Sequence, residues 1–235
     1  MQVIKKFQEL IEKLHDEDAI VVAHVGGRYA DIKYAHDAKL EPSVEVHSSW
    51  GTFEWILRDA FESGYRVGIV GSSDGHKGRP GAEYPGDSQF GSYGGLTCHL
   101  LPKLNRDSFF DAFRKRRHYA TTGARIYLDV TASLGDQTLQ IGDVVDTNEN
   151  QLDLSFNVIG TAPVERVDIF NGMDLVRTIR PWNEHAPLNR LRVTCAGQHY
   201  RGRGRLVKWE ISANFSNGEI SKINAINFWN PNRQP

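Results

Sequence analysis

Apolar residues follow two different patterns in the first third of the chain. They recur at three-to-four spacing over 3–14, which predicts an amphipathic helix. Apolar runs then occupy 19–23 and 66–71, the segment 43–47 is predicted to form a strand between them, and a second helical pattern covers 53–61. Strands that alternate with helices pair in parallel, so this part of the chain predicts a βα layer or barrel.

Local signals refine some of these boundaries. Thr52 is expected to cap the helix over 53–61, and Gly64 is expected to end it. Residues 31–39 can form a short helix, and 96–101 predict one more strand.

A third helix is expected over 109–113, and the basic run Arg114–Arg117 follows it. Cations suit the C-terminal end of a helix, where the macrodipole is negative. The run is interpreted as a solvated helix end, with a phosphate site as the alternative.

The pattern changes to short alternating segments after residue 125. Apolar and polar residues alternate over 126–131 and 152–158, which is typical of half-buried strands. The runs at 167–170 and 175–177 flank Asn171-Gly172, a dipeptide that accepts the positive φ of a two-residue hairpin turn. Further strands are expected at 190–195, 205–213 and 220–229. Short strands separated by turns predict an all-β sandwich.

Composition limits the classes of binding partner that the chain is expected to have, but it does not indicate the cellular compartment. Lys and Arg number 28 against 29 Asp and Glu, so no overall charge favours nucleic acid or an anionic membrane. Cys98 and Cys195 are too few to predict a disulfide framework or a cysteine-based zinc site. The sequence contains neither a signal peptide nor an apolar run of membrane-spanning length. We expect a soluble chain of undetermined location.

Potential metal ligands follow three of the predicted strands. His24 follows the strand at 19–23, Glu45 and His47 end the second strand, and Asp74 and His76 follow the third. The carboxyl ends of parallel strands meet at one edge of a sheet, so these five side chains can converge. Imidazole and carboxylate groups are ligands for zinc, manganese and iron. The repeated placement predicts a metal site at this edge.

The same segments resemble the later metal motifs of the PHP (polymerase and histidinol phosphatase) superfamily of hydrolases. The resemblance extends over about 17–130 and includes a PHP-like branch of unknown function that carries a β-rich appendage. The matching motifs are His24-Val-Gly-Gly, Val44-Glu-Val-His47-Ser, Gly71-Ser-Ser-Asp74-Gly-His76, Gly94-Gly-Leu-Thr-Cys and Tyr119-Ala-Thr-Thr-Gly123.

The resemblance implies an α/β fold in two parts. Residues 1–125 would be the C-terminal portion of a PHP-like domain, forming part of a distorted (β/α)7 barrel. Residues 126–235 would form an immunoglobulin-like β-sandwich. A complete site of this family holds up to three divalent transition metal ions, zinc, manganese or iron, and hydrolyses phosphoesters. The implied substrates are phosphorylated small molecules or phosphodiesters.

The roles of individual residues are implied only by this resemblance. His24 and His47 would be ligands of one metal, and Asp74 and His76 would be ligands of others at the catalytic centre. Glu45 would be either a further ligand or an acceptor that orients a histidine.

Three cations lie where they could hold a substrate phosphate. Arg28 follows His24, and Lys77 and Arg79 follow His76. Surface solubility is an equal alternative for all three.

The chain departs from the family at its start, because nothing before His24 supplies the family's opening His-x-His strand. We therefore expect the C-terminal part of a larger protein, with fewer than three metals. Its barrel would be completed by an N-terminal half or by self-association. Two other functions stay open: a non-catalytic scaffold that binds protein or glycan, and a metal-dependent amidohydrolase.

Overall fold

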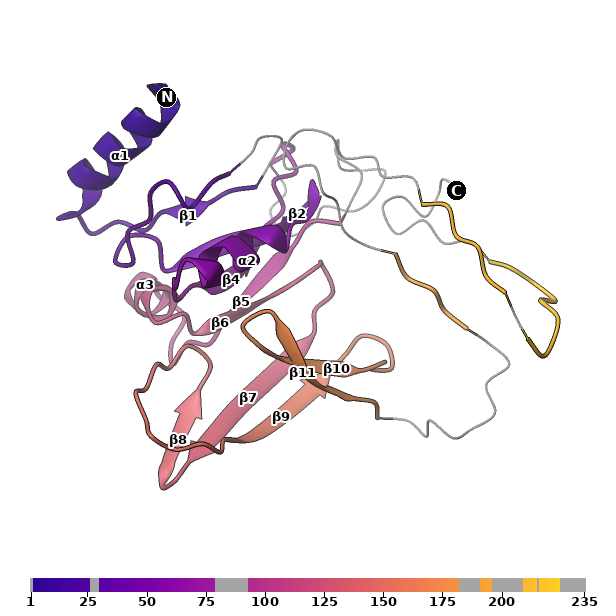
Figure 1. The fold of residues 1–235 in the computed structure, drawn as a ribbon. Coiled ribbons are helices and arrows are strands. Elements are labelled where there is room, and N and C mark those ends of the chain that lie inside the picture. The colour runs from indigo at the N-terminus through magenta and orange to yellow at the C-terminus, as the bar shows by residue number, and fades with distance from the viewer. Residues whose placement is uncertain are drawn as a thin grey trace.

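The computed structural model describes residues 2–25, 30–78, 93–181, 191–195, 209–214 and 216–224. Its elements are α1 (Gln2–Leu14), β1 (Val22–Ala23), β2 (Ser43–Ser48), β3 (Gly51–Thr52), α2 (Trp55–Glu62), β4 (Gly68–Gly71), β5 (Leu96–His99), α3 (Arg106–Arg114), β6 (His118–Thr121), β7 (Tyr127–Leu134), β8 (Gln137–Gln140), β9 (Asp153–Ile159), β10 (Val167–Asn171) and β11 (Asp174–Ile179). Figure 1 shows α2 lying beside β2 and β4, and α1 projecting from this group.

Strand β2 is the centre of the first sheet. It pairs in parallel with β1 on one side and with β4 on the other, and its end pairs antiparallel with β3. All six residues of β2 are buried. Val44 and Val46 of this strand share a core with Ile56 and Ala60 of α2. The apolar positions of 43–47 and 53–61 therefore form the main core, as their sequence patterns predict.

Strands β5 and β6 pair antiparallel, with α3 in the connection between them, and this pair is called the β5–β6 hairpin here. The hairpin is joined to the end of β4. Thr97 Oγ1 accepts a hydrogen bond from Gly71 N at 3.0 Å and donates one to Gly71 O at 2.7 Å. Gly95 N donates to Ser72 O at 2.8 Å. Helix α3 covers the hairpin, because its Phe113 ring lies against His99 and His118.

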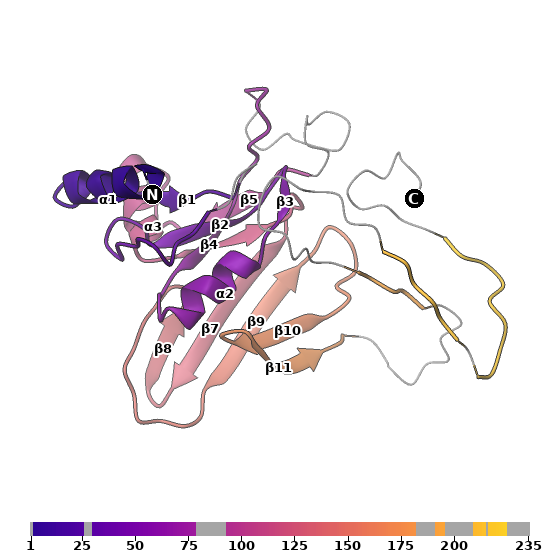
Figure 2. The same cartoon turned by 45° about the horizontal axis from the view of Figure 1, so that its top comes forward.

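The later strands form two separate antiparallel units. Strand β7 lies between β8 and β9 in one sheet, and β10 pairs with β11 in a hairpin. In Figure 2 this hairpin lies beside β9. The hairpin predicted here is present, but its turn is one residue later than expected: Asn171 still pairs with Asp174, and Gly172, at φ 61°, forms the turn with Met173.

The expected (β/α)7 barrel is wrong. Only three short helices occur among the described residues, and the strands lie in several small sheets. A barrel of this kind needs each strand to continue a closed parallel ladder. Here the two parallel ladders are those of β2, and the next two strands, β5 and β6, pair antiparallel with each other.

The β-sandwich expected over 126–235 stays a prediction. The described strands of this part pair antiparallel, which is loosely consistent with a sandwich. Leu154, Phe170, Leu175 and Val176 are between 41% and 65% exposed. The domain boundary near residue 125 stays a prediction.

Several expected elements are absent from the described residues. Turns take the place of the helix expected over 31–39. The described parts of the last three expected strands, 191–195, 209–213 and 220–224, carry no strand, and the rest of those ranges lies outside the described residues.

The expected cap of α2 is also wrong. Glu54 occupies the N-cap position without a side-chain hydrogen bond, because Thr52 lies in β3 and its hydroxyl contacts His47 Nδ1 at 2.7 Å. Gly64 ends this helix at φ 74°, as predicted.

The basic run after α3 forms structural ion pairs. Arg114 pairs with Asp18, Lys115 with Asp111 at 2.8 Å, and Arg117 with Asp143 at 2.8 Å. These contacts favour the helix-end interpretation over a phosphate site. None of the helices in the described ranges is long and apolar enough to cross a membrane.

The contact between Gly95 and β4 gives a test of the fold. A Cβ on Gly95 would lie 2.8 Å from both Gly71 Cα and Ser72 N, so backbone would have to move. We expect Gly95→Ala to lower the free energy of unfolding by about 2–3 kcal/mol. Gly135 has open space but φ 57°, so Gly135→Ala should cost only about 1 kcal/mol. Urea unfolding measures both, and equal losses would contradict the close approach.

Candidate functional site

The parallel strands bring three of the five predicted ligands together. His24 follows β1, Glu45 lies within β2, and Asp74 follows β4. The register pairs Ala23 with Val44 and Glu45 with Val70, so the ends of the three strands lie side by side. The predicted convergence of these side chains is therefore present.

The His24 ring lies between two carboxylates. Its Nδ1 is 2.9 Å from Glu45 Oε1, and its Nε2 is 3.2 Å from Asp74 Oδ2. The hydrogen bond with Glu45 is the main reason why the pKa of His24 is raised. Partial burial opposes this shift, and the negative charges of Glu45 and Asp74 add to it. The positive form of the ring is thus favoured where no metal is bound.

Glu45 is held on both of its oxygens. Its side chain is 9% exposed, Oε1 contacts His24, and Oε2 accepts a short hydrogen bond from the Ser72 hydroxyl. A buried carboxylate needs such partners, because an unpaired charge in this position would be costly. This geometry fits the interpretation of Glu45 as an acceptor that orients His24.

Asp74 and His76 occupy strained backbone positions. Both have positive φ, at 42° and 57°, which is uncommon for residues with side chains. His76 Nε2 lies 2.9 Å from Asp74 Oδ1, and Ser49 Oγ donates to Asp74 O at 3.1 Å. Asp74 Oδ2 is buried and has no hydrogen bond of good geometry. The turn therefore holds an incompletely satisfied carboxylate against His24.

His47 is not joined to this cluster. Its Nδ1 contacts Thr52 Oγ1 at 2.7 Å, and its Nε2 lies 2.9 Å from the carbonyl oxygen of Tyr93. Burial is the main cause of the lowered pKa of His47. Both ring nitrogens thus link β2 to other parts of the chain, and the role of His47 as a ligand stays a prediction.

The donor atoms fit a metal ion only in part. Two ligands of one tetrahedral zinc ion, each about 2.1 Å from it, lie about 3.4 Å apart. The separation of His24 Nε2 and Asp74 Oδ2, 3.2 Å, is close to this value. In the described part of the chain, however, no three His, Cys, Asp or Glu side chains are arranged to hold a metal. The described residues therefore bring one pair of potential ligand atoms together and not a complete set.

The structure describes only one of the three cations that were predicted to bind phosphate. Lys77 is exposed directly after His76, whereas Arg28 and Arg79 lie outside the described residues.

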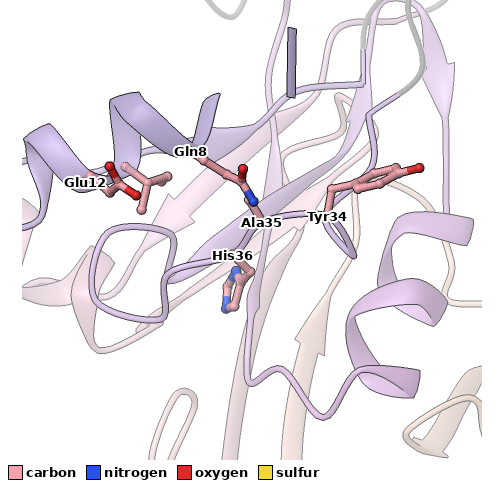
Figure 3. Close-up of a pocket in the computed structure, with 6 residues that line it drawn as sticks. Gln8, Glu12, Tyr34, Ala35 and His36 are labelled. Atoms are coloured by element: carbon pink, nitrogen blue, oxygen red, sulfur yellow. The ribbon is translucent and has the colours of Figure 1, made fainter. Parts of the chain in front are cut away.

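A surface pocket lies apart from the cluster. It is bounded by one side of α1 and by the segment 34–36, as Figure 3 shows. Its lining residues are Gln8, Ile11, Glu12, Tyr34, Ala35 and His36. None of them is a predicted site residue. The His36 ring is fixed by Glu41 at 2.7 Å and stacks on Tyr65 at 4.1 Å.

Sequence reasoning missed the part played by Ser72. Its hydroxyl donates to Glu45, its amide donates to His47 O at 2.9 Å, and its carbonyl accepts from Gly95 N. The signal that could have identified it is its position between the apolar run of β4 and Asp74, where a small polar side chain can reach β2.

Comparisons with known proteins give limited matches. No family model matches the chain, and no solved structure gives a significant match. Uncharacterized proteins of Chlamydia trachomatis serovar D and Chlamydia pneumoniae are 31% and 34% identical over 93 and 89 residues, each over 37% of this chain. An uncharacterized protein of Chlamydia muridarum is 25% identical over 171 residues, or 61% of this chain. The chain spans only 14%, 14% and 27% of these relatives.

The contact between Glu45 and His24 can be tested by titration of the metal-free protein. Replacing Glu45 by Gln removes the negative charge and exchanges the carboxylate acceptor, the main cause of the raised pKa of His24, for a weaker neutral amide oxygen. We therefore expect Glu45→Gln to lower the pKa of His24, measured by NMR of its ring protons. Glu54→Gln, at an exposed site, is the control and should leave it unchanged. An unaltered His24 pKa in Glu45→Gln would contradict the contact.

Proposed function

We propose that this chain carries part of the site of a metal-dependent hydrolase that acts on phosphoesters. The observation that carries the proposal is the His24 ring, which is held between Glu45 and Asp74 at the ends of three adjacent strands. The resemblance of these strand ends to PHP motifs adds support. A bound divalent transition metal would polarise a phosphoryl oxygen and acidify an attacking water.

The protein groups around this metal have distinct roles in the proposal. Glu45 accepts a hydrogen bond from His24 Nδ1–H, which would leave the lone pair of Nε2 available for a metal ion bound beside Asp74. Asp74 offers its unsatisfied Oδ2 next to that nitrogen. His76, which is half exposed, holds a proton at Nε2 close to Asp74 and can pass it to the leaving group.

Substrate binding would come from outside the cluster. Lys77 follows His76 on the exposed side and would pair with a phosphate. Arg28 and Arg79 are proposed to assist it.

One observation favours a second function. The described residues contain no complete set of three metal ligands. The alternative is therefore a non-catalytic module that keeps the hydrogen-bonded cluster as a structural element.

Metal binding separates these two functions. We expect the purified chain to bind Zn²⁺ or Mn²⁺ in equilibrium dialysis, and His24→Ala and Asp74→Ala to abolish binding. Glu45→Gln should weaken it by roughly 10–100-fold, because loss of an orienting partner typically has that effect. Asp136→Ala, in the exposed β7–β8 turn, is the control. Metal retention unchanged by His24→Ala and Asp74→Ala would contradict the proposed site.

A substrate panel tests the reaction class. The chain loaded with metal should hydrolyse p-nitrophenyl phosphate or bis(p-nitrophenyl) phosphate, and Asp74→Asn should lower kcat/KM by at least about 100-fold, as loss of a metal-ligand carboxylate would. Asp136→Asn should retain full activity. Hydrolysis of p-nitroanilide amides alone would indicate an amidohydrolase instead. Metal binding without turnover of any of these substrates would contradict hydrolysis by this chain alone.

A further inference from the structure

Two histidines face each other across the β5–β6 hairpin. The register pairs His99 with His118, and their ring centroids are 5.2 Å apart. The Phe109 ring lies 4.5 Å from His99, and the Phe113 ring lies 5.0 Å from His118. The two imidazoles therefore form part of the apolar contact between the hairpin and α3.

This environment suits neutral rings and not charged ones. His118 is 3% exposed, and its Nε2 lies 3.0 Å from Ser43 Oγ. Nδ1 of His118 and Nδ1 of His99 are both buried without a hydrogen-bond partner. Protonation would add a second N–H and a positive charge to each ring in a contact made largely of aromatic side chains, which is costly in a buried site.

The groups around His118 do not compensate a positive charge. Arg116 and a protonated His99 repel it, Ser43 of β2 is uncharged, and α3 presents aromatic rings. The carbonyl of Ala112, which also accepts from Arg117 N at 2.8 Å, favours the charged form, but this is a smaller effect than burial. Burial, His99 and Arg116 lower the pKa of His118 to about 4.

The hairpin is also connected to the candidate site. Gly95, directly before β5, donates to the carbonyl of Ser72, and the hydroxyl of Ser72 donates to Glu45. Release of the hairpin from β4 would remove the first of these bonds and free Ser72 to move.

We propose that the His99–His118 pair is an acid-sensitive latch that holds the β5–β6 hairpin and α3 on the β2–β4 sheet. The latch is closed while both rings are neutral. Acid protonates them, releases the hairpin and α3, and loosens the Ser72 support of Glu45. The device depends on packing and charge in this cluster and not on the proposed hydrolysis.

The sign and size of the effect follow from the pKa of His118. The pKa of His118 is about 4 in the closed, folded state and 6.5 when the ring is released. The stability that the packed neutral ring gives to the closed state is therefore fully present above pH 6.5. That contribution is lost as pH falls from 6.5 toward 4. Between pH 7 and pH 5 the opening equilibrium of the hairpin should increase by about 20-fold.

Hydrogen exchange of the intact chain tests the latch. Rates are measured by mass spectrometry at pH 7 and pH 5 and corrected for the intrinsic effect of pH. Protection of peptides from 96–121 should fall by about 20-fold in the wild-type chain. Peptides from α2 should stay protected. An equal loss in both regions would indicate global acid unfolding and overturn the latch.

Three variants make the test specific. His118→Gln can keep the contact with Ser43 but cannot titrate, so it should retain protection at pH 5. His99→Gln removes the second charge and should reduce the loss; it serves independently if His118→Gln does not fold. His15→Gln, at an exposed histidine, should show the full wild-type loss. The same loss in His99→Gln and His118→Gln as in the wild-type chain would overturn the proposal.

Discussion

The parallel pairing of β2 with β1 and β4 is the constraint on which the candidate site depends. The two ladders place the chain after β1 and the chain after β4 on either side of the β2 end, so His24 and Asp74 approach from opposite sides. The register of β2 with β4 shifts between Glu45 and His47. Glu45 contacts His24 and Ser72, whereas His47 contacts Thr52 and Tyr93. Two neighbouring polar residues of one buried strand thus have separate partners.

Burial of polar groups links this strand to the rest of the sheet. Glu45, His47 and Ser43 are all buried, and each side chain has at least one hydrogen-bond partner. Leaving a buried polar group unpaired costs about 1–3 kcal/mol, and more if it is charged. The partners come from segments distant in sequence, such as Ser72 and His118. Each polar residue of β2 therefore fixes a different segment against the sheet.

The sequence was sufficient to predict those elements whose structure depends on one local pattern of residues. The residue patterns of 43–47 and 66–71 predicted β2 and β4, and Asn171-Gly172 predicted the β10–β11 hairpin. The sequence was insufficient to predict the structure where a tertiary contact competed with the local preference of a residue. Thr52 is a good N-cap residue, but its hydroxyl contacts His47 instead. The placement of His24 with Glu45 and Asp74 followed from strand ends, whereas the part played by Ser72 required a register that periodicity does not specify.

The exposure of His24 determines the energetics of the cluster. The His24 side chain is 49% exposed, so water screens its attraction to Asp74, and an exposed pair contributes little. Glu45 is the more buried of the two carboxylates and makes the hydrogen bond that dominates the raised pKa of His24. Glu45 therefore sets the orientation of the ring. Because Asp74 Oδ2 lacks a good hydrogen bond, Asp74 is the carboxylate with remaining capacity to bind another group.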